Sequence, residues 1–422
     1  MAKKHDLLDD IIGITNDVNA LKKPFSGVTD ALMGLDDTEA PMWNPADYKE
    51  RPRANAHTCL ACRSEKSSCA RCAAVCPIDD CIRIEDGGIE IADSCRKCGV
   101  CVGACPTGAL VSLKDGPKKL YDRIAGAAAA YETAYVTCTR ALRRMPRENE
   151  VVVGCVGSVS PEVWFSILVD YPNVSVYLPL GACDKCKTTT GEEALGERIA
   201  QAEQWAGAGL GLEVEESALA CVKRREYERK EFVDKVLKTT GLAVSKANPV
   251  AAAATTVAER LRAHSKSISA LERTLNSACG TSTQKRRRVL THNRQLMLTA
   301  LQAHPDKAAN VEISVPACDD EKCTMCGDCV QACPLYANDL TSAGRFVVEP
   351  TYCVGCGLCA EVCEEHALSM VARPGDELVV PDPDEEIRRL EAEKARLEAE
   401  KLKRAGKKKL DDVLSRVEKL GE

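Results

Sequence analysis

Four cysteines fall within the twelve residues Cys323-Thr-Met-Cys326-Gly-Asp-Cys329-Val-Gln-Ala-Cys333-Pro334. A second run of the same form follows as Cys353-Val-Gly-Cys356-Gly-Leu-Cys359-Ala-Glu-Val-Cys363. Both have the spacing C-x2-C-x2-C-x3-C, in which three thiolates bind one iron–sulfur cubane and the fourth thiolate binds a neighbouring cubane. The sequence therefore predicts a pair of [4Fe–4S] clusters in this part of the chain.

The same pattern occurs far upstream. The run Cys95-Arg-Lys-Cys98-Gly-Val-Cys101-Val-Gly-Ala-Cys105-Pro106 is intact and precedes the run at Cys353 by 258 residues. Before it, Cys69, Cys72 and Cys76 match the last three cysteines of the run at Cys323 with an offset of 257. At that offset the missing first cysteine falls on Lys66, which cannot bind iron.

The missing ligand must therefore come from Cys59 or Cys62, which precede Lys66. A longer loop costs little additional entropy, so this insertion does not prevent cluster binding. We favour Cys59 and treat Cys62 as a spare. The remaining interpretations are that this first cluster is lost or is a three-iron form.

Two such runs in tandem resemble the bacterial two-cluster ferredoxin, over roughly residues 56–115 and again over 316–373. The resemblance implies short helices and small hairpins around two cubanes that exchange their fourth ligands. It also implies four ligand sets: site 1 takes Cys59 or Cys62 with Cys69, Cys72 and Cys105; site 2 takes Cys76, Cys95, Cys98 and Cys101; site 3 takes Cys323, Cys326, Cys329 and Cys363; site 4 takes Cys333, Cys353, Cys356 and Cys359. Glu364 departs from the pattern, because a proline is expected after Cys363.

Zinc knuckles also use C-x2-C pairs, but the third cysteine at x2 and the fourth before proline argue against zinc at these sites. Cys81, Cys279 and Cys318 have no partner at ligand spacing, and Cys221 opens a charged segment, so we interpret all four as packing residues.

Residues 120–245 have a different pattern. The β-branched runs Val151–Gly154 and Val174–Leu178 predict buried parallel strands, with a short third strand near Leu212–Val214. Helices are expected over Pro161–Asp170, with Ser160 as the N-cap, and over Glu192–Ala206. This alternation predicts a small α/β layer, in which ligands gather at the carboxyl ends of the strands.

Cysteines stand at those ends: Cys138, Cys155, Cys183 and Cys186. Together with Cys155-Val-Gly157, Pro161-Glu162 and Gly181-Ala-Cys183, they resemble the iron–sulfur delta subunit of methyl-viologen-reducing hydrogenase, which passes electrons to heterodisulfide reductase. The resemblance implies a [2Fe–2S] cluster. The chain departs from that family in having a single cysteine, Cys138, at the first position and a closer last pair. A structural zinc and a metal-free scaffold remain the other interpretations.

The composition excludes several classes of protein. The chain has 422 residues, 25 of them cysteine, and a net charge of −6, which does not suggest a nucleic-acid partner. The sequence shows no secretory signal, no long apolar run, no G-x-G-x-x-G after a strand and no P-loop. We expect a reducing, cytoplasmic compartment, and any membrane contact only through a partner.

The predicted fold class is α+β multidomain: two dicluster ferredoxin-like domains flank a small α/β domain, with a helical connector and helical termini. The expected segments are an N-terminal helix and tether (1–54), the first ferredoxin-like domain (55–117), the α/β domain (118–245), the connector (246–314), the second ferredoxin-like domain (315–376) and a charged C-terminal helix (377–422).

The sequence predicts an electron-transfer subunit of an anaerobic oxidoreductase complex, with no catalysis of its own. Its expected partners are redox subunits: a flavoprotein, a hydrogenase or a heterodisulfide-reductase-like protein. Two alternatives are a disulfide- or sulfur-reducing enzyme that uses Cys183 and Cys186, which have the C-x-x-C form of thiol redox motifs, and a redox sensor or scaffold.

Overall fold

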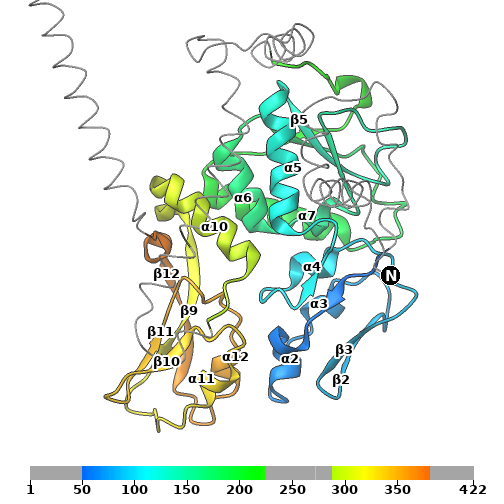
Figure 1. Cartoon of the computed structure of the whole chain (residues 1–422). Helices are drawn as coiled ribbons and strands as arrows, with labels where there is room; N and C mark the ends of the chain where they lie inside the picture. The colour runs from blue at the N-terminus through cyan, green and yellow to red at the C-terminus, as the bar shows by residue number, and fades with distance from the viewer. Residues whose placement is uncertain (1–49, 225–270, 272–287, 381–422) are drawn as a thin grey trace, which may run out of the picture. The chain divides into compact units, whose positions relative to one another are not determined.

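The computed structural model describes residues 50–224, 271 and 288–380 (Figure 1). The predicted N-terminal helix and tether, most of the connector and the charged C-terminal helix lie outside these residues, as does Cys279. Within the described residues, no helix is both long and apolar enough to cross a membrane.

The middle region contains a parallel four-stranded sheet in the order β6-β5-β7-β8. Its strands are β5 (Ala134–Cys138), β6 (Glu150–Val153), β7 (Val174–Tyr177) and β8 (Gly211–Glu213). Every residue of β5 and β6 is buried, as their runs of β-branched and aromatic residues predict for strands covered on both faces. The predicted strands at 151, 174 and 212 are confirmed to within one or two residues.

Three helices accompany this sheet: α5 (Pro117–Ala130), α6 (Pro161–Asp170) and α7 (Gly191–Ala206). Helix α6 begins as predicted, because the Ser160 hydroxyl accepts a hydrogen bond from the Val163 N–H at 3.4 Å and Pro161 occupies the first turn. Helix α7 ends at Gly207, whose φ of 62° is the left-handed conformation that terminates many helices.

Helix α10 (His292–Ala303) lies in the predicted connector but packs against α5 and α6. Leu296, Leu298 and Leu301 are almost fully buried and belong to the same hydrophobic core as Trp164 and Phe165 of α6. This part of the connector is therefore a structural part of the α/β core rather than a spacer.

The two cysteine-rich segments, residues 55–117 and 315–376, are built alike from antiparallel strand pairs and short helices. In the first, β1 (Arg53–Ala54) pairs with β4 (Leu110–Val111) and β2 (Ile82–Glu85) with β3 (Gly88–Ile91). In the second, β9 (Glu312–Cys318) pairs with β12 (Leu368–Pro374) and β10 (Asn338–Leu340) with β11 (Phe346–Val348).

Their helices are short: α2 (Leu60–Arg63), α3 (Arg71–Ala74) and α4 (Val100–Ala104) in the first segment, α11 (Asp328–Ala332) and α12 (Leu358–Glu361) in the second. The chain also has 3₁₀ turns at Ala56–Thr58, Val156–Ser158, Glu216–Ala218, Pro305–Asn310 and Gly375–Leu378. These small hairpins and single-turn helices agree with the secondary structure expected from the two-cluster ferredoxin.

Candidate iron–sulfur centres

The three intact cysteine runs share one backbone conformation. Gly99, Gly327 and Gly357 follow the second cysteine of their runs and have φ values of 79°, 83° and 87°. Glycine adopts this left-handed conformation without a steric penalty, and each of the three turns the chain into the short helix that carries the third cysteine. In the incomplete run the equivalent residue is Ala70, with a φ of −126°. The first run thus differs in its backbone as well as in its missing ligand.

Backbone N–H groups point at the sulfur atoms of these runs. The last cysteine of each intact run accepts a hydrogen bond from the N–H four residues later, at 3.2 Å for Cys105, 3.4 Å for Cys333 and 3.3 Å for Cys363. A hydrogen bond of this kind stabilises a thiolate more than a thiol and raises the potential of a cluster bound to it.

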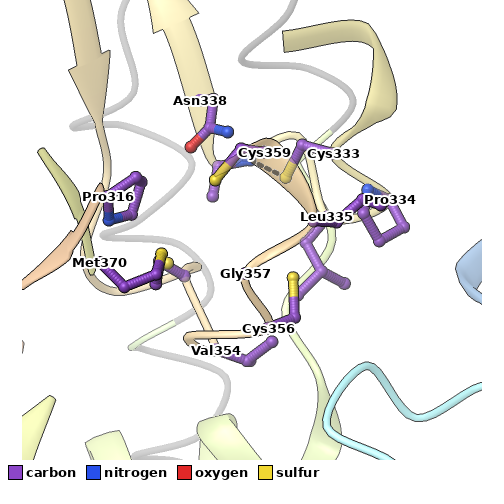
Figure 2. A pocket seen from close by; sticks show the side chains of 13 residues that line it. Pro316, Cys333, Pro334, Leu335, Asn338, Val354, Cys356, Gly357, Cys359 and Met370 are labelled. Atoms are coloured by element: carbon purple, nitrogen blue, oxygen red, sulfur yellow. Dashed lines mark hydrogen bonds between the residues drawn. The ribbon is translucent and has the colours of Figure 1, made fainter. Parts of the chain in front are cut away.

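The four cysteines of site 4 surround one cavity (Figure 2). Cys333, Cys353, Cys356 and Cys359 line it together with apolar side chains such as Pro316 and Met370. The cavity itself has a volume of only about 20 Å³, and a value of about 350 Å³ is reached only when the open solvent at its mouth is included. Four sulfur atoms in an apolar, half-enclosed space fit the donor set of a [4Fe–4S] cluster.

In each of the other predicted ligand sets, neighbouring thiols contribute to one another's pKa. Burial raises the pKa of Cys72 to about 11, and the next contributions include the nearby thiols of Cys105, Cys59 and Cys69, which complete site 1. For site 2, burial raises the pKa of Cys101, followed by the effect of Cys98, Cys95 and other nearby thiols that include Cys76. For site 3, burial raises the pKa of Cys329 to about 11, followed by Cys326, Cys323 and Cys363.

Cys59 and Cys62 lie side by side at site 1. Cys59 is buried, with 7% of its surface exposed, whereas Cys62 is half-buried. Burial raises the pKa of Cys62 to about 11, and its hydrogen bond with Cys59 adds to the shift. Both thiols therefore border this site, and the buried position of Cys59 favours it as the ligand.

The strand-end cysteines converge at one edge of the middle sheet. Cys138 ends β5, Cys155 follows β6 by two residues, and Cys183 and Cys186 lie in the loop after β7. These three strands are adjacent and parallel, so their carboxyl ends meet. Burial raises the pKa of Cys155 to about 12, and nearby Cys138, Cys98 and Cys186 contribute. Burial likewise raises the pKa of Cys183 to about 11, and nearby Glu192, Cys138 and Cys186 add to the shift.

Close packing shapes this strand-end site, which comprises Cys138, Cys155, Cys183 and Cys186. The Cys138 sulfur accepts a hydrogen bond from the Ala141 N–H and the Cys186 sulfur one from the Thr188 N–H, each at 3.4 Å. Helix α7 begins against the site at Gly191, where a Cβ atom would lie only 2.7 Å from the Cys155 Sγ. Only glycine fits there without displacing the sulfur.

Site 2 is the neighbour of the strand-end site. The Cys98 thiol lies near that of Cys186 and hydrogen-bonds the Thr188 side chain. The Thr190 hydroxyl donates a hydrogen bond to the Val75 carbonyl at 2.7 Å, one residue before Cys76, a predicted ligand of site 2. The α/β region and the first cysteine-rich segment therefore present their cysteines to each other.

A buried arginine spans this junction. Arg198 of α7 is 7% exposed and donates hydrogen bonds to the carbonyl oxygens of Gly157 and Val100, the latter at 3.1 Å. No carboxylate of the described residues lies within 4 Å of its guanidinium, and burial lowers its pKa. A buried cation without a carboxylate partner suits a place between anionic metal clusters.

The second cysteine-rich segment has a matching residue. Arg294 of α10 is 8% exposed and donates a hydrogen bond of 2.5 Å to the carbonyl oxygen of Cys353, a site 4 ligand. It likewise makes no ion pair with a described carboxylate, and burial lowers its pKa. The two arginines therefore occupy similar places beside sites 2 and 4.

Two further cysteines border the sites although we interpreted them as packing residues. Cys81, 2% exposed, hydrogen-bonds the thiols of Cys76 and Cys95 at site 2. Cys318 ends β9 beside site 3, and burial and a hydrogen bond with Cys323 raise its pKa to about 12. Each lies five residues from a run, a distance that carries no ligand motif. Cys221 is exposed.

No group of three or more histidine, cysteine, aspartate or glutamate side chains among the described residues is drawn together as around one metal ion. This holds for the ferredoxin-type runs as well as for the strand-end site, so it does not distinguish one kind of centre from the other.

Comparison with known families defines the class of these two segments. Residues 322–368 match the 4Fe–4S dicluster domain and residues 89–111 match the 4Fe–4S binding domain. Ferredoxin-type 4Fe–4S domains are therefore present in both cysteine-rich segments, and they support iron–sulfur electron transfer as the function. Neither match extends into the α/β region.

Among curated proteins, the chain is similar to the pyruvate synthase subunit PorD of Methanocaldococcus jannaschii, with 36% identity over 56 residues. PorD of Methanothermobacter marburgensis is 36% identical over 55 residues. Each match covers 13% of this chain and less than two thirds of the relative, 65% and 63% respectively. No solved structure matches the chain.

Proposed function

We propose that this chain is the electron-transfer subunit of a multi-subunit oxidoreductase and binds four [4Fe–4S] clusters at sites 1 to 4. The proposal is supported by sixteen cysteines that fall into four sets of four by their spacing, and by the match of both cysteine-rich segments to 4Fe–4S domains. When bound, each cluster takes up and releases one electron, at a potential set by hydrogen bonds, charge and exposure.

Backbone and side-chain groups of the protein would set the reduction potentials of these clusters. Backbone N–H groups donate to the sulfur atoms of Cys105, Cys333 and Cys363, and Arg198 and Arg294 place positive charge beside sites 2 and 4. Both features favour a reduced, more negative cluster. Apolar side chains limit the access of water to the cavity of site 4.

We further propose a fifth centre at the strand-end site, and a [2Fe–2S] cluster as its occupant. The proposal is supported by the four cysteines at or after the carboxyl ends of adjacent parallel strands, and the two-iron assignment by the resemblance to the hydrogenase delta subunit. The closeness of Cys98 supports electron exchange with site 2. A zinc ion at this site would instead make it structural, because zinc has no redox chemistry.

The proposed partners are other redox subunits, such as a flavoprotein, a hydrogenase or a heterodisulfide-reductase-like protein. The curated relatives support this assignment, because they are named as subunits of pyruvate synthase. We place the complex in the cytoplasm of an anaerobic cell, with membrane contact only through a partner.

The proposal is tested by reducing the anaerobically purified protein in steps with a photochemical donor while visible absorbance is recorded. We expect about four electrons per chain from the cubanes, about five if the strand-end site is redox-active, with full recovery on oxidation by a one-electron dye. Iron-loaded protein that takes up no electrons reversibly would overturn the proposal and favour a sensor or scaffold.

The alternative function, disulfide or sulfur reduction at Cys183 and Cys186, is less well supported. Burial raises the pKa of Cys183 to about 11, which disfavours the nucleophilic thiolate form of this one residue. Turnover of a small disulfide by the isolated chain, abolished by Cys186→Ser, would favour the alternative.

A further inference from the structure

The two residues by which the chain departs from the ferredoxin pattern bind each other. Lys66 occupies the place of the missing first ligand, and Glu364 occupies the place of the proline after Cys363. The Lys66 Nζ lies 2.7 Å from the Glu364 Oε1, although the residues are 298 positions apart. The sequence shows these as two separate departures and does not reveal that the two side chains are paired.

Further contacts surround this ion pair. The Ser68 hydroxyl donates to the Glu361 carboxylate at 2.5 Å, and the Ser68 N–H donates to the same group at 3.2 Å. Arg63 donates a hydrogen bond of 2.5 Å to the Gln331 carbonyl. All of these contacts join the first cysteine-rich segment to the second.

An apolar core lies beneath the polar contacts. Leu60 of α2 packs with Leu358 and Val362 of the second segment, and none of the three is more than 4% exposed. Predicted ligands of three sites pack against this core: Cys69 of site 1, Cys329 of site 3 and Cys356 of site 4. The contact between the segments is therefore also a contact between their candidate clusters.

We propose that Lys66, Ser68, Glu361 and Glu364 form a clasp that holds the two cysteine-rich segments together, so that electrons pass directly between them. This inference rests on the proposed function. Electron tunnelling weakens steeply with distance, so a contact that brings site 1 beside sites 3 and 4 governs that exchange. In such an exchange a bound cluster of one segment would give up one electron and a bound cluster of the other would take it up, with no bond made or broken.

The clasp gives each of the two departures a role. Lysine at position 66 binds no iron, and its ammonium group reaches the opposite segment instead. Glutamate at position 364 supplies a charge that proline lacks, and the backbone of its run still has the N–H···S bond to Cys363. The first ligand of site 1 then comes from the preceding residues, where Cys59 and Cys62 lie.

The test uses the full-length, cluster-loaded protein with the variants Lys66→Glu, Glu364→Lys and the double exchange. Hydrogen exchange of the Ser68 amide reports the clasp directly, because Glu361 is its acceptor. We expect each single variant to speed this exchange about fivefold, near the upper end of what an exposed ion pair contributes. The double exchange restores the opposite charges and should return the rate to within about twofold of the original.

The matched control is Lys118→Glu, which breaks a partly buried lysine–aspartate pair of 2.6 Å within α5 and should leave the Ser68 amide unaffected. A second measurement is electron paramagnetic resonance of the reduced protein, in which magnetic coupling between segments should weaken in the single variants and return in the double variant. Unchanged exchange and coupling in both single variants, or no recovery in the double variant, would overturn the clasp.

The outcomes separate the clasp from the proposed function. All of these side chains are partly exposed, so the variants should fold and keep their iron, which an iron assay checks. A clasp failure leaves full iron content and reversible reduction intact. Loss of the proposed function would appear already in the unaltered protein, as missing iron or an absence of reversible reduction, whereas Ser68 exchange would still respond to the variants.

Discussion

Cys59 caps the start of α2 and Cys62 lies within that helix, and both thiols border site 1. We expect Cys59→Ser to change the spectrum of one cubane, because it removes the buried ligand, and Cys62→Ser to leave all cubanes intact. The pairing of the two thiols predicts that Cys62 partly replaces Cys59 in the first variant. The double variant should therefore lose up to about four irons per chain, measured by iron assay and electron paramagnetic resonance.

Equal loss of iron in the two single variants would contradict this assignment of roles. Loss only in Cys62→Ser would reverse it and make Cys62 the ligand.

Arg198 is the residue that joins site 2 to the strand-end site electrostatically. Arg198→Gln removes a buried positive charge, so the potential of an adjacent cluster should fall by about 50–100 mV, for a separation of about 10 Å and an effective dielectric constant near 20. A redox titration followed by electron paramagnetic resonance measures the shift. Arg224→Gln, at the far end of α5 where the side chain binds the Tyr131 carbonyl, is the control and should shift nothing. Unchanged potentials in Arg198→Gln would show that Arg198 does not influence the potential of an adjacent cluster.

At the scale of elements, the start of α7 closes the strand-end site. Gly191→Ala places a methyl group against the Cys155 sulfur and should displace that ligand. We expect loss of about two irons per chain while the cubane iron stays. Gly196→Ala on the same helix meets no atom within 4 Å and should keep all iron and stabilise the helix by about 0.5–1 kcal/mol. Full iron content in Gly191→Ala would contradict the presence of a cluster there.

The junction of α6 and α10 has a pH-dependent contact. His304, which follows α10, lies 2.9 Å from the carboxylate of Asp170 at the end of α6, and this hydrogen bond raises the pKa of His304. A raised pKa means that the contact stabilises the fold fully below the unfolded value of about 6.5 and loses this effect as the pH rises through the folded value.

The expected contribution is at most about 1 kcal/mol, because the pair is partly exposed. His304→Gln should lower the thermal midpoint at about pH 6 and leave it nearly unchanged at about pH 9. An equal loss at both pH values would show that packing, rather than charge, explains the effect.

Local patterns predicted the elements that depend on local chemistry. Ser160 and Pro161 mark the start of α6, and the spacing of cysteines identified the ligand runs, because caps and metal motifs are read over a few residues. The central place of β5 in the sheet and the burial of α10 depend on packing between distant residues. No spacing rule carries that information.

For the candidate site, too, local sequence patterns were informative and contacts between distant residues were not foreseen. The strands that carry Cys138, Cys155, Cys183 and Cys186 are adjacent and parallel, so their carboxyl ends meet at one edge, while a shared metal site for these cysteines stays a prediction. The approach of Cys81 and Cys318 to sites 2 and 3 and the pairing of Lys66 with Glu364 were not expected. These contacts arise between residues outside any ligand motif.

For the whole molecule, the proposed function predicts a series of redox centres that runs through one protein. The strand-end site adjoins site 2, sites 1 and 2 share the first cysteine-rich segment, and the Leu60 core brings site 1 to sites 3 and 4. We expect partner subunits to deliver and remove electrons at the ends of this series.

The number of clusters is measured by an iron and sulfide count on anaerobically purified protein, with electron paramagnetic resonance after reduction. We expect about 18 irons per chain: about 16 from four cubanes and about two from the strand-end site. A value of about 16 would keep the four cubanes and remove the fifth centre. Fewer than about 14 irons per fully loaded chain would contradict the four intact cubanes on which the account rests.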